Sequence, residues 1–204
     1  MSKGTLSQIV GDATRPANEG AQPIVIPHIV NDICRWRTGF VKAITDRWGP
    51  GPQLAYEWWY NLHQYNNRSE DDTETKYPKD PMLDLHNAGW HHESPFVLGG
   101  CQTIKLPNNI YIANMLAQRS IMIEPEDDRP PIRYGALVGS MQLVLAAVHD
   151  IQHKTGTIPE IHCPMFGSDR AGGNWEVILQ MIREIWVDNG WNVVVYKHGQ
   201  SPDV

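Results

Sequence analysis

The chain has 204 residues, of which 41% are apolar and 20% are charged, and these values are typical of one globular domain with a full hydrophobic core. A formal net charge of −6 without a basic stripe argues against a general binder of nucleic acid or of anionic membranes. Three cysteines far apart in the chain, no signal-peptide core and no apolar run long enough to cross a bilayer lead us to expect a soluble, cytoplasmic protein with reduced thiols.

The N-terminal part alternates short apolar runs with helical patterns. Residues 5–10 and the nearly continuous apolar run 24–30 predict two strands, and Pro27 favours an edge position or a bulge for the second. A helix is predicted over 40–48, where the apolar residues share one face and the sequence GPGP follows. Residues 53–60 predict a second, aromatic helix whose large side chains pack in the core.

Residues 61–96 differ in character from the rest of the chain. They are polar, interrupted by prolines and without apolar periodicity. Loops of this length are usually functional or disordered. We therefore expect a single domain over residues 1–204 that carries a polar surface insertion at about 61–96.

After this segment the alternation of strands and helices resumes. Residues 98–106 and 110–117 predict two strands joined by a turn, and 130–153 a buried helix introduced by two prolines. A further strand is expected at 191–196. Because helices separate most of the strands, the pattern predicts a largely parallel or mixed sheet with helices on both faces.

A short strand, a glycine-containing loop and an amphipathic helix follow one another in residues 161–186. The loop carries Gly167, Gly172 and Gly173, and the helix starts near Asn174. Helix N-termini leave backbone N–H groups unpaired, and glycine lets a phosphate approach the backbone closely. The loop matches neither the dinucleotide-binding nor the Walker glycine pattern. The stretch is consistent with a phosphate-binding loop or with an ordinary strand-to-helix turn.

Polar loops follow several of the predicted strands, at 11–14, at 31–39, from 118 onward and at 167–173. In sheets of this kind, ligands bind outside the carboxyl ends of the strands. Two of the loops are rich in small residues, and both lead into helices. The simplest prediction is a ligand with two phosphates held between two helix N-termini.

Five segments in this order, GDAT, IVND followed by RTGF, YIANMLAQ, PPIRY and FGSDRAGGNWEVI, resemble the macro domain family, which binds ADP-ribose. The resemblance covers nearly the whole chain except residues 61–96. It is greatest to the bacterial and viral branch related to ADP-ribose-1″-phosphate phosphatases and terminal ADP-ribose glycohydrolases, so a phage or bacterial protein is implied. The implied fold is a three-layer α/β/α macro domain with a mixed, mostly parallel central sheet.

The resemblance also implies roles for individual residues. Asp12 would accept a hydrogen bond from the adenine 6-amino group, which suits an ionised carboxylate. Asn31 would contact the distal ribose, and both residues could instead be turn residues after their strands. The implied ligand-contacting residues are Asp12, Ala13, Asn31, Arg37, Thr38, Gly39, Phe40, Gln118, Phe166, Gly167, Ser168, Asp169, Arg170, Ala171, Gly172 and Gly173.

The chain departs from the family pattern at three places. Gln118 stands at the position of the nucleophilic lysine of the terminal ADP-ribose glycohydrolases, and Ala171 at the position of their catalytic aspartate. Glutamine cannot form a Schiff base, so that covalent mechanism is not supported. Asp169 lies two residues from Ala171 and is a weak substitute. In the first loop, Trp36 and Arg37 could crowd the terminal ribose.

These departures leave two functional hypotheses. In the first, Asn31 orients the distal ribose and a water held by a phosphate or by Asp32 attacks the terminal phosphate or the C1″ bond, with no metal or cofactor. Asn31 and Asp32 are then the catalytic candidates. In the second, the chain is a non-catalytic module that reads or sequesters ADP-ribose-type nucleotides. The expected partner is ADP-ribose or a related nucleotide, with an ADP-ribosylated macromolecule as a further candidate.

Two sets of residues could suggest a metal site. His149 and His153 are four residues apart, but aspartate replaces the glutamate of the zinc-peptidase motif, and both suit the end of a helix. The second set comprises His86, His91, His92 and Cys101. Its spacing matches no common zinc site, so we expect incidental histidines in a polar insertion.

Overall fold

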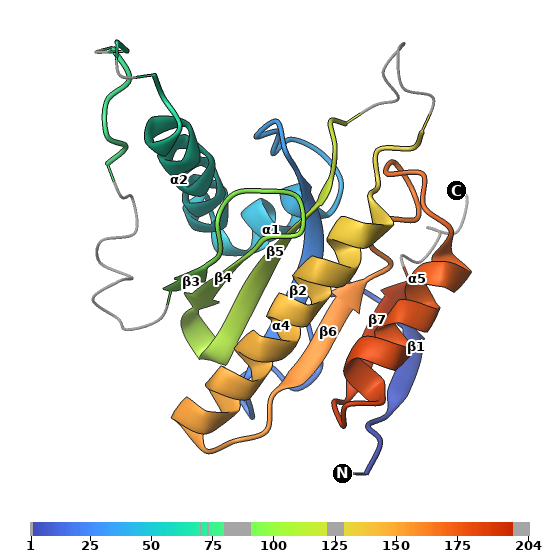
Figure 1. The fold of residues 1–204 in the computed structure, drawn as a ribbon. Coiled ribbons are helices and arrows are strands. Elements are labelled where there is room, and N and C mark those ends of the chain that lie inside the picture. The colour runs from blue at the N-terminus through green and yellow to red at the C-terminus, as the bar shows by residue number, and fades with distance from the viewer. Residues whose placement is uncertain (1, 70, 73, 80–90, 122–128, 198–204) are drawn as a thin grey trace, which may run out of the picture.

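The computed structural model describes residues 2–69, 71–72, 74–79, 91–121 and 129–197. In this part of the chain, seven strands form one sheet in the order β1-β7-β6-β2-β5-β4-β3, with helices on both faces (Figure 1). The strands are β1 (Leu6–Val10), β2 (Ile24–Asn31), β3 (His91–Glu93), β4 (Cys101–Leu106), β5 (Ile110–Gln118), β6 (Glu160–Pro164) and β7 (Val193–Lys197). The longer helices are α1 (Phe40–Trp48), α2 (Gly51–Asn66), α4 (Tyr134–Thr155) and α5 (Trp175–Ile182).

The sheet is mixed and mostly parallel, as the sequence predicted. Strands β1, β7, β6, β2 and β5 pair in parallel, and β4 and β3 continue the sheet antiparallel. The five parallel strands therefore end at one edge of the sheet. The loops after β2 and β6 lie at this edge, at the upper end of the sheet in Figure 1.

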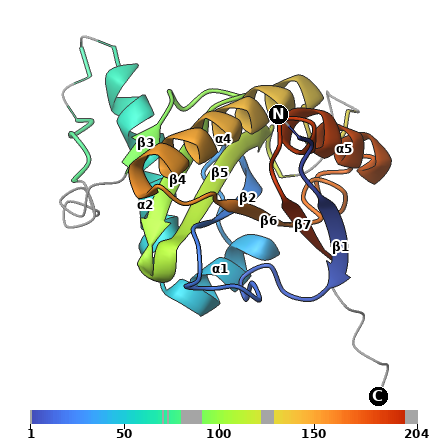
Figure 2. The same ribbon diagram turned by 90° about the horizontal axis from the view of Figure 1, so that it is seen from below.

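The helices form an outer layer on each face, which confirms the three-layer architecture. In Figure 2, α4 and α5 lie on one side of the sheet and α1 on the other. One core cluster packs α4 and α5 on the sheet through residues such as Leu137, Val144 and Ile178, all fully buried. The other packs α1 and α2 on the opposite face through Ile44 and Trp59.

The position predicted for Pro27 is wrong. Strand β2 is central, between β6 and β5, and its register shift falls between Val30 and Asn31. Proline is tolerated because the ladder between β2 and β6 covers only Ile24 and Val25. Pro27 thus lies beyond the last pair with β6, where its missing N–H removes no ladder bond on that side.

The aromatic helix is longer than predicted. α2 begins at Gly51, with Pro52 in the first turn, where its missing N–H costs no helical hydrogen bond. It continues to Asn66, so the first six residues of the segment expected as an insertion, 61–66, are helical. Tyr56, Trp58 and Trp59 are buried, which confirms their packing in the core.

Two further boundaries differ from the sequence prediction. The strand expected to start at residue 98 starts at Cys101, and β3 pairs antiparallel with it at residues 91–93. α4 ends at Thr155 with Gly156 in the left-handed conformation, where it acts as a C-cap. Among the described residues, α4 alone has the length and composition of a membrane span. Its buried face packs on the sheet, as in the core helix of a globular domain.

The histidine pairs considered for a metal site have other placements. The ring of His149 packs edge to face on Trp191, with ring centroids 4.9 Å apart. His153 lies in the last turn of α4, where a basic residue suits the helix dipole. Of the second set, His86 lies outside the described residues and Cys101 is buried in the core.

Candidate functional site

The central strands β2 and β6 separate toward their carboxyl ends. Only two residue pairs join them, Ile24 with Glu160 and Val25 with Ile161. The chain leaves β2 through α1 and α2 toward the β5 side of the sheet, and it leaves β6 through α5 toward β7. Where the connections of neighbouring parallel strands depart in opposite directions, a crevice opens outside the strand ends, and ligands of α/β proteins bind there.

Asn31 organises the loop that follows β2, residues 32–39 (loop 1). It is buried, and its Nδ2 donates to the carbonyl oxygen of Arg35 at 2.7 Å. Its Oδ1 accepts from the backbone N–H of Arg35 at 2.9 Å and of Ile33 at 3.3 Å. The carboxamide is thus directed into its own loop, and the turn-residue interpretation of Asn31 has direct structural support. Contact with a distal ribose stays a prediction.

Trp36 does not crowd the crevice, contrary to the sequence expectation. Its side chain is buried, and its Nε1 donates to the hydroxyl of Thr45 in α1 at 2.9 Å. The indole packs edge to face on the ring of His28, with centroids 5.6 Å apart. Trp36 therefore packs inside the protein and holds loop 1 in place. Of the two residues expected to crowd the terminal ribose, Trp36 and Arg37, only Arg37 is exposed.

The end of loop 1 exposes unpaired backbone donors. Gly39 has φ +79° and no side-chain cap, and α1 begins at Phe40. The N–H groups of Phe40 and Val41 have no acceptor within the described part of the chain. Such N–H groups at a helix N-terminus favour anions. Thr38, Gly39 and Phe40 thus lie at the start of α1, and their contact with a phosphate stays a prediction.

Residues 165–173, which follow β6, form a closed glycine loop (loop 2). Gly173 donates its backbone N–H to the carbonyl oxygen of Gly167 at 2.8 Å. Gly167 has φ +78°, and a Cβ there would lie 2.7 Å from Cδ1 of Ile132. A Cβ on Gly173 would lie 2.5 Å from the Gly167 carbonyl oxygen. Glycine is therefore required by the packing of the loop itself.

The unpaired backbone donors of loop 2 belong to the loop and not to the α5 terminus. Asn174 caps that helix, because its Oδ1 accepts from the Glu176 N–H at 2.9 Å. By contrast, the backbone N–H groups of residues 168–171 have no acceptor among the described residues. Phe166 and Ala171 are buried beneath them, while Asp169 and Arg170 are exposed.

Loops 1 and 2 are in contact at the carboxyl ends of β2 and β6. The guanidinium of Arg170 donates a hydrogen bond to the hydroxyl of Thr38, which joins loop 2 to loop 1. Both residues are exposed. The structure therefore brings together the two loops that the sequence identified separately, with an arginine at their junction.

Asp12 lies at the carboxyl end of β1, beyond β7 from loop 2. Its Oδ1 accepts from the Thr14 N–H at 2.9 Å and from the Thr14 hydroxyl at 2.8 Å. Its Oδ2 is 3.8 Å from Nε of Arg15. The side chain is 48% exposed, so one carboxylate oxygen remains accessible to a ligand. Ala13 is buried.

Asp32 and Gln118 tie the ends of β2 and β5 together. Asp32 donates its backbone N–H to the Gln118 carbonyl at 3.0 Å, and its Oδ1 accepts from the Ser120 N–H at 2.7 Å. The Gln118 side chain donates to the Ser120 carbonyl at 2.9 Å. The Gln118 side chain therefore bonds within the turn that follows β5, and the links to β2 are made by the backbone of Gln118 and Ser120.

A thiol nucleophile is not available in loop 1. Burial and the nearby Glu57 carboxylate raise the pKa of Cys34 to about 11. The thiol is therefore protonated at neutral pH, and a protonated thiol is a poor nucleophile.

Two cavities lie near α2. One, of about 300 Å³, borders Asp32 and is lined otherwise by residues of α2, of the segment before β4 and of β5: His63, Gln64, Phe96, Val97, Leu98 and Leu116. Apart from Asp32, the sequence did not single out these residues, because no local pattern connects α2 with a turn more than thirty positions later.

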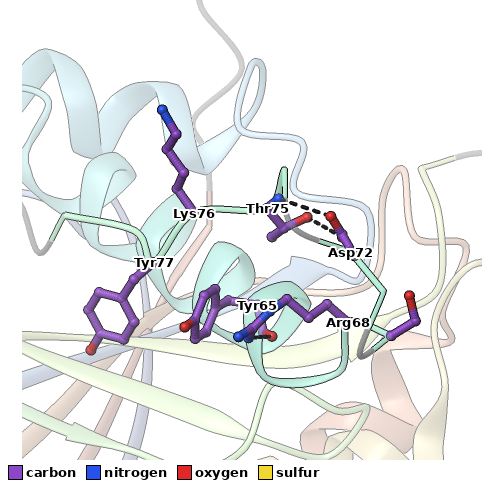
Figure 3. A pocket seen from close by; sticks show the side chains of 7 residues that line it. Tyr65, Arg68, Asp72, Thr75, Lys76 and Tyr77 are labelled. Atoms are coloured by element: carbon purple, nitrogen blue, oxygen red, sulfur yellow. Dashed lines mark hydrogen bonds between the residues drawn. The ribbon is translucent and has the colours of Figure 1, made fainter.

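The other cavity, of about 680 Å³, is formed by α2 and the segment after it, residues 65–77 (Figure 3). The guanidinium of Arg68 lies 3.6 Å from the centre of the Tyr65 ring, and Asp72 accepts hydrogen bonds from Thr75. Lys76 points away from this stack in Figure 3. No residue of loop 1 or loop 2 lines this cavity.

Comparison with known proteins places this fold in a family. No protein-family model and no curated protein matches the sequence. Among solved structures, a protein of unknown function from Bacteroides thetaiotaomicron is 29% identical, with a TM-score of 0.71 over 96% of this chain and 99% of that one. A macrodomain protein from Streptomyces coelicolor is 25% identical, with a TM-score of 0.66 over 96% of this chain and 100% of that one.

The chain has the macro domain fold. A third similar structure is that of Thermosipho africanus DarTG in complex with ADP-ribose. It is 10% identical with a TM-score of 0.61, and the match covers 99% of this chain but 45% of that one. At this identity the likeness concerns the macro domain fold alone.

Proposed function

We propose that this macro domain binds ADP-ribose or a close derivative in the crevice between β2 and β6. The observation that carries the proposal is the junction of loops 1 and 2 at Thr38 and Arg170. Both loops present backbone N–H groups that have no acceptor in the described part of the chain. A diphosphate at this junction would accept hydrogen bonds from both loops and would pair with the arginine. The related DarTG structure with ADP-ribose supports this choice of ligand.

The sheet order supports the direction in which the ligand would lie. Asp12 ends β1, loop 2 follows β6, and loop 1 follows β2. Three inter-strand steps of about 4.8 Å separate β1 from β2, so the site is roughly 14 Å long. An adenine bonded to Asp12 would place the diphosphate between the loops and the distal ribose near the ends of β2 and β5.

We further propose that the bound nucleotide is hydrolysed at its terminal phosphate or at its ADP-ribosyl bond, with Asp32 as the general base. One oxygen of Asp32 is held by the Ser120 N–H, which fixes the carboxylate, and the other has no partner among the described residues; the side chain borders the cavity of about 300 Å³. Asp32 would take a proton from water as the water oxygen attacks C1″ or the phosphorus. The bond to the leaving group then breaks, and the leaving group keeps the electron pair and takes up a proton.

A non-catalytic module that binds ADP-ribose is the second candidate. One observation favours it: Ala171, at the position of the catalytic aspartate in related glycohydrolases, is buried and only 4% exposed. An ADP-ribosylated macromolecule is the partner that such a module would recognise.

Titration calorimetry with ADP-ribose tests the binding proposal. Asp12→Ala and Gly172→Glu should each weaken binding by more than about tenfold, because they remove the adenine acceptor and place a carboxylate in the phosphate loop. Asp46→Ala, on the exposed side of α1, is the matched control and should leave the affinity unchanged. Absence of binding by the unmutated protein at millimolar ADP-ribose would overturn the proposal.

Incubation with ADP-ribose 1″-phosphate or with ADP-ribosylated protein separates the two candidates. Release of phosphate or of ADP-ribose that Asp32→Asn abolishes supports the enzyme. Binding without release supports the non-catalytic module.

A further inference from the structure

The cavity of about 300 Å³ beside Asp32 lies next to the proposed distal-ribose position. Its lining includes Asp32 at the end of β2, His63 and Gln64 of α2, and Phe96 and Leu98 from the segment before β4. It is thus a space between α2 and the carboxyl ends of β2 and β5, on the opposite side of β2 from β6. Its volume suits a small group of atoms.

The sheet order makes this cavity the continuation of the crevice. A ligand that starts at Asp12 crosses the ends of β7 and β6 before it reaches β2, and the next strand is β5. Asp32 and Leu116 of the cavity lie at the ends of β2 and β5. Whatever is attached to C1″ of the distal ribose would therefore enter this cavity.

The charge of the cavity decides which kind of group it accepts. Asp32 Oδ1 is occupied by the Ser120 N–H, and no lysine or arginine in the described residues forms an ion pair with this carboxylate. The walls contributed by Phe96, Val97 and Leu98 are apolar. A carboxylate in such surroundings attracts a cation that donates hydrogen bonds and repels a phosphate or a carboxylate.

The shape of the walls adds a second criterion. The ring of His63 borders the cavity. The ring of Phe96, with its centroid 5.8 Å from that of His63 and its plane tilted by 42°, is only 5% exposed and packs on Trp59 and Tyr60. Nδ1 of His63 is engaged with the Asn67 carboxamide at 3.1 Å, which holds the ring in place. Planar guanidinium groups stack on aromatic faces while they donate to a carboxylate, which a compact ammonium does less well.

We propose that this cavity receives the group bonded to C1″ of the distal ribose, and that this group is the guanidinium of an ADP-ribosylated arginine. Asp32 accepts from the guanidinium N–H groups, the ring of His63 stacks on its plane, and Leu98 contacts the methylene stem. The inference rests on the proposed function, because it takes the distal ribose to lie at the end of β2.

Calorimetry with three probes tests the inference: ADP-ribose, ADP-ribosyl-arginine and ADP-ribose 1″-phosphate. The protein should bind ADP-ribosyl-arginine about tenfold more tightly than ADP-ribose, a difference of about 1.4 kcal/mol. It should bind the 1″-phosphate more weakly than ADP-ribose. Chromatography of each sample after the titration checks that the probe is intact.

Variants that fill the cavity test its role independently of the ADP-ribose site. Leu98→Trp enters the cavity from a position that is 36% exposed, and it should abolish the preference for ADP-ribosyl-arginine without changing the affinity for ADP-ribose. Gln64→Trp fills the cavity from the α2 side and serves as the second variant if the first does not fold. Val177→Trp, on the exposed face of α5, is the control and should change neither affinity.

The outcomes distinguish the inference from the proposed function. Binding of ADP-ribose with an unaltered arginine preference in both cavity-filling variants, or tighter binding of the 1″-phosphate, overturns the inference and leaves the crevice intact. No binding of ADP-ribose overturns the proposed function as well. Asp32→Asn should reduce the arginine preference and raise the affinity for the 1″-phosphate, a pattern that loss of packing alone does not produce.

Discussion

Thr38 and Arg170 are 132 positions apart in the chain, and a hydrogen bond from the guanidinium to the hydroxyl joins them. Each belongs to a different loop, and each loop follows a different central strand. This contact therefore joins the two loops that carry the unpaired backbone donors.

Replacement of Arg170 by alanine should weaken ADP-ribose binding by about tenfold, because a charge-assisted hydrogen bond contributes about 1.5–3 kcal/mol and the junction also opens. Thr38→Val keeps the shape and removes only the acceptor, so we expect a loss of about threefold. Calorimetry on the two single variants and the double variant measures the coupling. If the losses of binding free energy in the two single variants add up to that of the double variant, the two residues act independently and their hydrogen bond does not contribute to binding. Arg183→Ala, outside both loops, is the control.

Replacement of Gly167 by alanine should destabilise the protein by about 2–4 kcal/mol, because the added Cβ is strained at φ +78° and meets Ile132 at 2.7 Å. Gly156 is the matched control, since it has φ +69° and a Cβ added there would meet no atom within 4 Å. Gly156→Ala should cost only about 1 kcal/mol. Urea unfolding at neutral pH gives both values. Equal losses would mean that the packing of loop 2 contributes nothing beyond its backbone conformation.

Stability should fall as the pH is lowered from about 6.5 to 4. Burial lowers the pKa of His28 from 6.5 to about 4 in the folded protein. Between these values the unfolded chain binds a proton that the native state does not, so unfolding is favoured as the pH falls. The difference corresponds to about 3 kcal/mol at about 1.36 kcal/mol for each pH unit. Burial also lowers the pKa of His162, which adds in the same direction.

Urea unfolding at neutral pH and at two mildly acidic pH values above the folded-state pKa of His28 measures this dependence. His28→Gln removes the titrating group, and its stability should vary less over this range than that of the unmutated protein. The same slope in both proteins would assign the dependence to other groups.

Replacement of Trp36 by phenylalanine should cost about 1–2 kcal/mol of stability, because it removes the hydrogen bond to Thr45 and part of a buried ring. Because Trp36 is internal to loop 1, the affinity for ADP-ribose should change by less than about threefold, or ~0.6 kcal/mol. Thermal unfolding and calorimetry on the same variant give the two quantities. A large loss of affinity for ADP-ribose at unchanged stability would indicate that Trp36 contacts the ligand.

The fold was predictable because its pattern is local. Apolar runs such as 24–30 and the periodic helix after Asn174 alternate in the order that a parallel sheet requires, and the order of short motifs identified the family. The central position of Pro27 was not predictable, because it depends on where β6 stops pairing with β2. The helical residues 61–66 were missed because they are polar and follow an aromatic run.

The candidate site was predictable only in part. The two loops and the residues at the strand ends follow from motif and strand order, and the structure brings Thr38 and Arg170 into contact. Their contact with a ligand stays a prediction. The direction of the Asn31 carboxamide into loop 1, the burial of Trp36 and the cavity beside Asp32 depend on side-chain packing between elements distant in sequence. The spacing of residues in the sequence does not predict such packing.

The short ladder between β2 and β6 also has a mechanical consequence. The sheet consists of two well-paired portions, β1-β7-β6 and β2-β5-β4-β3. They are joined at one end by two residue pairs, and the proposed nucleotide site lies at the other end. A ligand bound by loops 1 and 2 would bridge the two portions of the sheet where β2 and β6 are not paired. At about a hundredfold excess over its Kd it would stabilise the protein by about 2.7 kcal/mol. Slower amide hydrogen exchange should accompany this gain, concentrated in the carboxyl ends of β2 and β6.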